Sequence, residues 1–271
     1  MGQSNQHRNS LSFVIAVNNE KVFEQNVLAS PIFRSGHGHE ILVRRGFASA
    51  GAAYNDAISA ATNDLIVCMH QDIYLPDGWD ERLMMSVVSL EGSGEKWGVL
   101  GCFGISLEGG PVGHVYSNGL KRELGSPQPP VRVQSLDEIV LIIRKSSGLQ
   151  FDEMLPHFHL YGSDLCLESQ RMGLRNYAIA NFCVHNSLPV IKLPPEFWQC
   201  ADYLQKKWHR ELPIATPCIY ISTSKVLMRL KRVKYWLISY QKRLGRLQYE
   251  RLTDHALSEV APLVWTASFR S

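Results

Sequence analysis

The stretch from Asp64 to Trp79 (DLIVCMHQDIYLPDGW) constrains the fold of this 271-residue chain more than any other. It opens with the apolar run Leu65–Met69, which is short, lacks a helical period and is rich in branched residues, as buried parallel strands are. The polar residues His70, Gln71 and Asp72 follow directly. Because open α/β sheets bind ligands at the carboxyl ends of their strands, the segment predicts a binding site. A carboxylate there can hold a divalent cation, or it can simply cap the following helix.

Strands and helices alternate through the first 105 residues. The pattern predicts strands at 11–17, 40–44, 65–69 and 97–104, with helices at about 20–30, 49–61 and 78–90. This alternation specifies an α/β fold with a mostly parallel central sheet and helices on both faces. No Gly-x-Gly-x-x-Gly follows the first strand, which argues against a dinucleotide-dependent oxidoreductase.

Beyond residue 105 the pattern mixes strands with loops. We expect a loop or hairpin at 109–130, one strand at 131–144, a loop rich in aromatic and histidine residues at 151–161, a helix at 162–173, short strands at 177–180 and from 183, and helices at 196–209 and 225–251. The chain is thereby divided into a disordered lead at 1–10, an α/β domain at 11–218 and a basic helical C-terminal extension at 219–271.

Composition and charge limit the classes of partner and the cellular compartment to be expected for this protein. The net charge of +3 is too small to predict nucleic-acid binding. The six cysteines form no Cys-x-x-Cys pair and mostly lie in apolar runs, which favours reduced, buried thiols and a cytoplasmic location. The first ten residues are polar, so no signal peptide is expected, and no apolar run approaches the roughly 20 residues that span a bilayer.

Positive charge is concentrated in the segment 225–251, which has nine Lys or Arg residues against the single acid Glu250. Leu, Val and Trp are interleaved with these cations. Three structures explain the pattern: a solvated helical face, a contact in a homo-oligomer, or a helix lying on an anionic membrane surface. The last would place the protein at the inner face of the membrane.

Asp72, Asp164 and His185 each fall at the end of a predicted element. Mn²⁺ and Mg²⁺ take carboxylate and phosphate oxygens, and Mn²⁺ also accepts an imidazole. A second carboxylate nearby could take the proton of a hydroxyl nucleophile. Sugar transfer from a nucleotide diphosphate needs both functions, because a cation stabilises the leaving diphosphate while a base activates the acceptor.

Five segments, in this order, carry a resemblance to a known family: SFVIAVNNE, GAAYNDAISAATNDLIV, HQDIYLPDGW, FDEMLPHFHLYGSDLCLESQRMG and CVHNS. They resemble the family 2 glycosyltransferases of GT-A fold, and more narrowly the glycosyltransferase-like domain found in a streptomycin biosynthesis protein. The resemblance runs from Phe13 to about Pro217. It implies a hexosyltransferase-like enzyme of polysaccharide or antibiotic biosynthesis, which moves a sugar from a nucleotide-diphosphate donor with inversion. The acceptor hydroxyl would belong to a glycan, a lipid-linked acceptor or a small molecule.

The same resemblance implies a role for each matching residue. Asp72 and His185 would hold Mn²⁺ or Mg²⁺, and Asp164 would be the general base. The nucleotide-sugar donor would contact Asn18, Glu20, Arg45, Asn55, His70, Gln71 and Asp72. The acceptor would contact His159 and Tyr161.

Two departures from the family's pattern keep a second hypothesis open. His70 stands where the metal motif has its first acid, and Arg44-Arg45-Gly46 stands where the second strand normally ends in acidic residues. An arginine could contact a phosphate instead. The same changes also fit a non-catalytic carbohydrate- or nucleotide-binding module on a GT-A scaffold.

Overall fold

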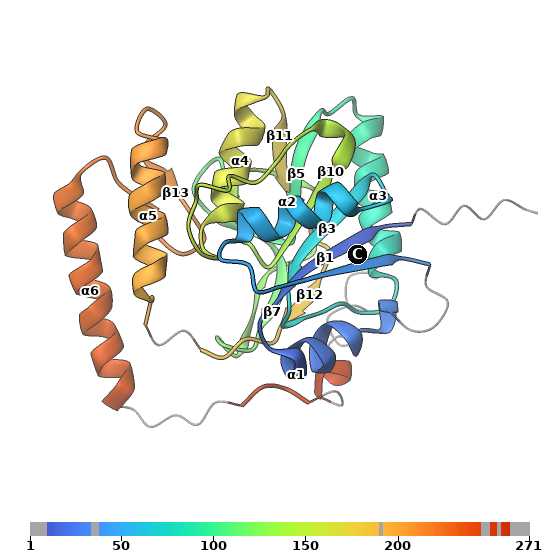
Figure 1. Ribbon diagram of the computed structural model, residues 1–271, viewed down its shortest axis with the longest axis horizontal. Helices are drawn as coiled ribbons and strands as arrows, with labels where there is room; N and C mark the ends of the chain where they lie inside the picture. The colour runs from blue at the N-terminus through green and yellow to red at the C-terminus, as the bar shows by residue number, and fades with distance from the viewer. Residues whose placement is uncertain (1–9, 34–37, 190–191, 245–249, 254–255, 261–271) are drawn as a thin grey trace, which may run out of the picture.

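The computed structural model describes residues 10–33, 38–189, 192–244, 250–253 and 256–260. Its centre is a 12-stranded sheet in the order β2-β1-β3-β10-β5-β11-β9-β6-β7-β12-β4, with β8 paired to β7 (Figure 1). The strands of this sheet are β1 (Ser12–Val17), β2 (Glu40–Arg45), β3 (Leu65–His70), β4 (Ile73–Tyr74), β5 (Trp97–Gly101), β6 (Phe103–Ser106), β7 (Pro111–Ser117), β8 (Arg122–Gly125), β9 (Val131–Leu136), β10 (Val140–Arg144), β11 (Arg175–Ala178) and β12 (Cys183–His185). A separate pair joins β13 (Ile214–Ala215) to β14 (Tyr220–Ile221).

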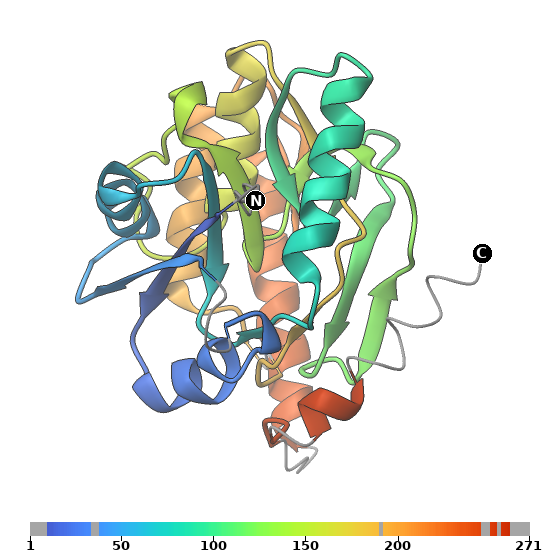
Figure 2. The same ribbon diagram turned by 90° about the vertical axis from the view of Figure 1, so that its right-hand side faces the viewer.

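Helices cover both faces of the sheet, and Figure 2 shows α2 and α3 on opposite sides. The labelled α-helices are α1 (Glu20–Phe23), α2 (Ala50–Ala60), α3 (Trp79–Gly92), α4 (Tyr161–Arg171), α5 (Pro195–Lys207) and α6 (Lys225–Leu244), and residues 256–260 are helical as well. A π-helical turn at Glu24–Leu28 extends α1, and short 3-10 turns lie at Pro31–Phe33 and Lys145–Ser147. Among the helices of the described residues, none is long and apolar enough to cross a membrane.

Strand β3 shows why its sequence is a continuous apolar run. Ile66 and Cys68 belong to the core beneath α2 and α4, whereas Val67 and Met69 belong to the core beneath α3. Successive side chains of a strand point to opposite faces, so a strand covered on both sides must be apolar at every position. The predicted α/β class is therefore confirmed.

The sheet is more mixed than the predicted mostly parallel one. Parallel pairing joins β1 to β2 and β3, β5 to β11, and β7 to β12. Strand β10 lies between β3 and β5 and is antiparallel to both. The pairs β6–β7, β6–β9 and β7–β8 are antiparallel as well. Short connections join β6 to β7 and β7 to β8, which is the hairpin pairing that antiparallel strands allow.

Several expectations about elements need correction or closer bounds, and the first is the strand predicted at 97–104, which is two strands, β5 and β6. The predicted strand 131–144 is two strands, because the Asp137 carboxylate accepts a bond from the Ile139 N–H at 3.3 Å and turns the chain between them. The hairpin expected within 109–130 is confirmed as β7 and β8. The helix predicted for 225–251 is observed from Lys225 to Leu244, residues 245–249 lie outside the described residues, and Glu250 and Arg251 are not helical. Apart from Ser10, the predicted disordered lead lies outside the described residues.

Candidate functional site

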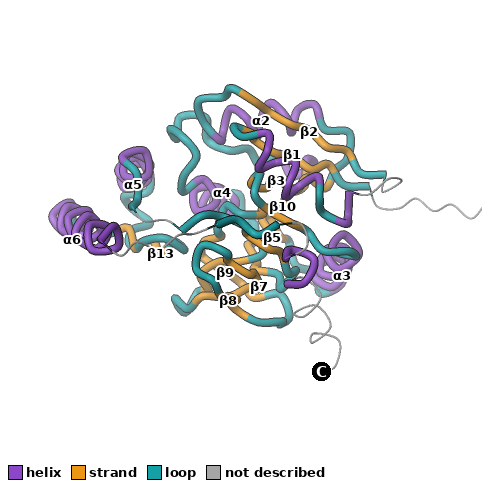
Figure 3. The backbone as a smooth tube through the Cα atoms, turned by 90° about the horizontal axis from the view of Figure 1, so that it is seen from below, coloured by secondary structure: helices purple, strands orange, loops and turns teal. Residues whose placement is uncertain are grey.

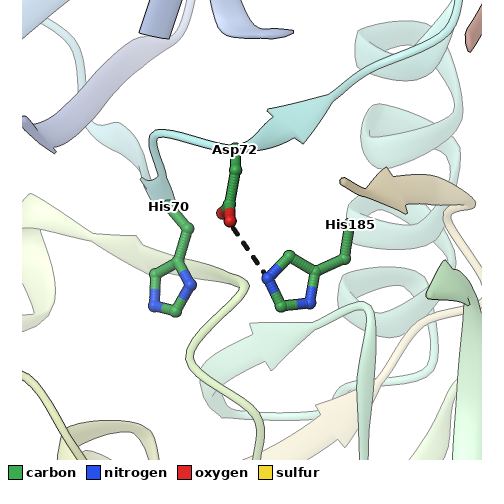
Figure 4. A group of neighbouring side chains, drawn as sticks. All are labelled: His70, Asp72 and His185. Carbon is green, nitrogen blue, oxygen red and sulfur yellow. Dashed lines mark ion pairs between the residues drawn. The ribbon is translucent and has the colours of Figure 1, made fainter. Parts of the chain in front are cut away.

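Three side chains that were predicted to lie at strand ends come together at the carboxyl ends of β3 and β12. His70 ends β3, Asp72 follows it, and His185 ends β12. Their candidate ligand atoms all lie within 4.8 Å of one another. Figure 4 shows the Asp72 carboxylate between the two imidazoles, with its Oδ1 3.5 Å from His185 Nε2. The antiparallel pairing of β4 with β12 fixes this arrangement, because it sets His185 opposite Ile73.

Asp72 and His70 have the charge states that a divalent cation requires, whereas the Asp72 carboxylate raises the pKa of His185 and so favours its imidazolium form. The two imidazoles and Arg251 hold the pKa of the Asp72 carboxyl well below its usual range in spite of its burial. Burial lowers the pKa of His70, which favours the neutral imidazole that binds metals. One carboxylate and two imidazoles fit Mn²⁺, which accepts nitrogen ligands, better than Mg²⁺, which prefers oxygen.

A pair of buried tyrosines supports His70. The hydroxyl of Tyr161 lies 2.9 Å from His70 Nε2 and 3.2 Å from the hydroxyl of Tyr54. Burial raises the pKa of both tyrosines, so each remains a hydroxyl. Such a neighbour fixes the orientation of an imidazole and sets which nitrogen faces a ligand.

Arg251 joins the cluster from the far end of the chain. Its Nη1 lies 3.3 Å from Asp72 Oδ2 and also donates to the carbonyl of Asn186. Asn186 holds this segment in place, because its side chain accepts from the Leu252 N–H at 2.8 Å and donates to the Leu252 carbonyl at 3.0 Å. The sequence showed only that Arg251 belongs to a basic segment, and nothing in it indicates a contact 179 positions away.

A cavity of about 640 Å³, which we call the first cavity, opens at the ends of β1, β2 and β3. Gln71 ties the end of β3 to the end of β1, because its Oε1 accepts from the N–H groups of Asn18 and Asn19 at 3.0 Å each. At the rim, the Arg45 guanidinium donates to both carboxylate oxygens of Glu20, at 2.6 and 2.9 Å. The lining includes most of the residues predicted for the donor: Asn18, Glu20, Arg45, His70, Gln71 and Asp72.

Asn55 lies elsewhere. Its side chain accepts from the N–H of Phe151 and donates to the Phe151 carbonyl, each at 2.9 Å. Asn55 is not one of the described residues that line the first cavity. Its observed contacts anchor the 151–160 loop to α2.

A second cavity, of about 760 Å³, lies on the other side of His70. His70 and Phe158 line both cavities, and His185 lines the second. His159 lines the second cavity, as expected for an acceptor residue, whereas Tyr161 faces the first. Much of the remaining lining is apolar: Phe103, Val115, Leu120, Leu124, Ile139, Leu160, Leu188, Leu193 and Phe197.

Asp164, the predicted base, is enclosed by α5. Its carboxylate accepts from Trp208 Nε1 at 2.6 Å and from Lys207 Nζ at 2.9 Å. Lys207 also contacts Asp152 and Glu168, and these carboxylates raise the pKa of its ammonium group. Asp164 is 1% exposed and belongs to the described lining of neither cavity.

Glu138 is a carboxylate that does reach the second cavity. The backbone amides of Leu160 and Gly162, where α4 begins, favour its ionised form. A Cβ atom at position 162 would lie 2.8 Å from the Leu136 carbonyl oxygen and 3.3 Å from Glu138 Cγ, so glycine leaves room for the acid. Burial, helped by the charge of Asp137, raises the pKa of Glu138 to about 8. No pattern in the sequence singles out Glu138.

Comparison with known proteins gives a family, a curated relative and solved structures. Residues 12–193 match the model of a glycosyltransferase-like family. "ATP synthase subunits region ORF 6" of Fuscovulum blasticum is 30% identical over 157 residues, which cover 55% of this chain and 61% of that protein. The chain thus spans less than two thirds of this relative.

Two solved structures share the general arrangement. The mannosyltransferase PcManGT from Pyrobaculum calidifontis, in complex with GDP-Man and Mn²⁺, is similar with a TM-score of 0.46 and 11% identity, over 98% of this chain and 82% of that one. GalNAc-T7 with UDP, GalNAc and Mn²⁺ is similar with a TM-score of 0.49 and 10% identity, over 74% of this chain and 49% of that one.

Proposed function

The chain belongs to the glycosyltransferase-like family, and from this premise we propose that it transfers a sugar from a nucleotide-diphosphate donor to an acceptor hydroxyl. One observation carries the proposal: the Asp72, His70 and His185 cluster stands where a cavity of mixed lining and a largely apolar cavity meet. A transferase must hold two substrates with the reacting atoms adjacent, and this arrangement supports that requirement.

The first cavity is proposed to bind the nucleotide. Glu20, Arg45 and Gln71 supply polar groups at its walls. Arg251 is not part of the described lining, but its guanidinium lies 3.3 Å from Asp72 Oδ2 and is suited to a phosphate held there. Asp72 and His185, with His70, would hold Mn²⁺, which when bound would neutralise charge on the diphosphate. Such an enzyme fits the GT-A family 2 pattern of the sequence.

Glu138 is proposed as the general base, in place of Asp164. It would take the acceptor's hydroxyl proton while the acceptor oxygen bonds to the anomeric carbon and the bond from that carbon to the diphosphate breaks. Glu138 lines the second cavity, on the other side of His70 from the proposed donor. Attack from the face opposite to the leaving group inverts the anomeric carbon. Asp164 lacks this position, because Lys207 and Trp208 already bind its carboxylate.

One observation favours a second function, a nucleotide-binding module without chemistry. Arg251 lies 3.3 Å from Asp72 Oδ2, where it can balance the carboxylate without a metal ion. A module of this kind would bind a nucleotide independently of Mn²⁺ and would not turn over a donor.

Thermal unfolding with UDP, GDP, dTDP and CDP, each with and without Mn²⁺, followed by a donor-turnover assay, tests the two functions. A nucleotide at about 100 times its Kd should stabilise the protein by roughly 2.7 kcal/mol. We expect one nucleotide to act only with Mn²⁺, and Asp72→Asn to abolish both the shift and turnover. Asp202→Asn is the control, because Asp202 pairs with Arg232 away from the site. A Mn²⁺-independent shift without turnover would support the binding module instead.

A further inference from the structure

Helix α6 stands at the outer edge of the molecule, beyond α5 and far from the central sheet (Figures 1 and 3). One side of it packs inward. Met228 is buried in the core, the Tyr235 ring lies 6.0 Å from that of Trp198, and Arg232 pairs with Asp202 at 2.9 Å. The helix is therefore attached along a narrow face, and most of its circumference is open.

The opposite side of α6 carries an exposed apolar stripe, formed by Val226, Leu230, Val233 and Leu237. These residues are 63%, 59%, 55% and 51% exposed. Their spacing of four, three and four positions puts them in line on one helical face. A contiguous exposed stripe of this kind marks an interaction surface, because scattered apolar side chains on ordinary surfaces do not align.

Cations flank the stripe. Lys225, Arg229 and Lys234 are exposed on its two sides, and the whole helix has seven Lys or Arg residues and no Asp or Glu. A surface that is apolar along its centre and positive at both edges is complementary to acyl chains beneath anionic headgroups. It is poorly suited to a second copy of itself, since two such helices would bring like charges together.

We propose that α6 docks the protein on a bilayer that carries anionic lipid headgroups. The helix lies along the surface, with Val226, Leu230, Val233 and Leu237 entering the headgroup region and the flanking cations binding lipid phosphates and carboxylates. This inference is independent of the sugar-transfer proposal, because it rests on α6 alone. It selects one of the three explanations that the sequence left open for this segment.

Vesicle flotation of the full chain tests the docking. We compare vesicles of phosphatidylcholine alone with vesicles that contain about 30% phosphatidylglycerol, at low and high salt. Binding to the anionic vesicles should be stronger by about ten-fold or more and should weaken as salt screens the cations. The double variant Leu230→Gln with Val233→Gln should lose about ten-fold or more of this binding.

A matched control comes from α3, where Met85 and Val88 are 69% and 63% exposed but lie on a helix whose first turn is acidic. Met85→Gln with Val88→Gln removes as much exposed apolar surface and should leave vesicle binding unchanged. Unchanged melting curves establish that both double variants fold.

Three results would overturn the proposal. Wild-type protein that fails to float with anionic vesicles has no such surface. Equal losses in the α6 and α3 variants would show non-specific adhesion. A wild-type dimer in sedimentation velocity that the α6 variant dissociates would assign the stripe to a second copy of the chain.

Discussion

The two cavities that meet at His70 are built in different ways. The first is made mainly of residues at or near the ends of neighbouring strands β1, β2 and β3, so its polar groups follow directly from the chain order. The second combines segments that range from β6 to the loop between β13 and β14. Its Glu138 has room only because position 162, in α4, is a glycine. The residues of the first cavity can therefore be recognised from short sequence segments, whereas those of the second cavity come together only through tertiary packing.

The largest expected effect separates the cavities by function. Glu138→Gln should lower the transfer rate by about 10²–10⁴, the usual contribution of a general base, and should leave nucleotide binding in the first cavity intact. Steady-state kinetics and nucleotide-induced melting shifts measure the two properties. Glu108→Gln, an exposed change in the turn before β7, is the control. Full transfer activity in Glu138→Gln would remove this residue from the mechanism.

Asp164→Asn tests whether the sequence-predicted base has a structural role instead. Lys207 would lose a buried partner, so the free energy of unfolding should fall by about 3 kcal/mol. The folded fraction should keep most of its transfer activity, because Asp164 reaches neither described cavity lining. Chemical denaturation and active-site-normalised rates check this. A stable variant that has lost the reaction would restore Asp164 as the base and break the contrast between the two acids.

The raised pKa of Glu138 predicts opposite pH trends for activity and stability. The native carboxyl keeps its proton to about pH 8, whereas the unfolded one loses it near 4.5, so stability should fall as pH rises between these values. Activity should rise over the approach to pH 8, because the base must be ionised. The charge of Asp137 acts on this acid, and the charge of Glu138 in turn raises the pKa values of Tyr54, Tyr161, Cys166, Cys200 and Cys218.

Denaturation curves of wild type and Glu138→Gln from pH 5 to pH 8 isolate the contribution of Glu138, on the order of 2 kcal/mol. The variant should show a flatter stability profile than the wild type over this range. Parallel profiles would mean that Glu138 has an ordinary pKa.

Arg251→Gln is expected to have the smallest effect. Loss of one charged contact to a phosphate should raise the KM for the donor about ten-fold, with kcat little changed, which corresponds to about 1.4 kcal/mol. Arg210→Gln, an exposed change after α5, is the control. A KM equal to that of wild type would restrict Arg251 to holding the 250–253 segment in place.

Physical locality explains what the sequence could predict. The buried run 65–69 indicated the sheet, and the polar residues after it indicated the cluster. Both features depend on only a few consecutive residues, so a short sequence segment is enough to predict them. The direction of the Asp164 side chain depends on Lys207 and Trp208, at the C-terminal end of α5. The position of Arg251 depends on the carbonyl of Asn186. No periodicity encodes such contacts.

Gly162 has a consequence for how relatives of this chain can diverge. Any side chain at position 162 would collide with the Leu136 carbonyl and crowd Glu138. Because the nearer obstacle is a backbone oxygen of β9, no change at position 138 makes room for a side chain at 162. Variants can therefore exchange the acid at 138 far more easily than the glycine that faces it.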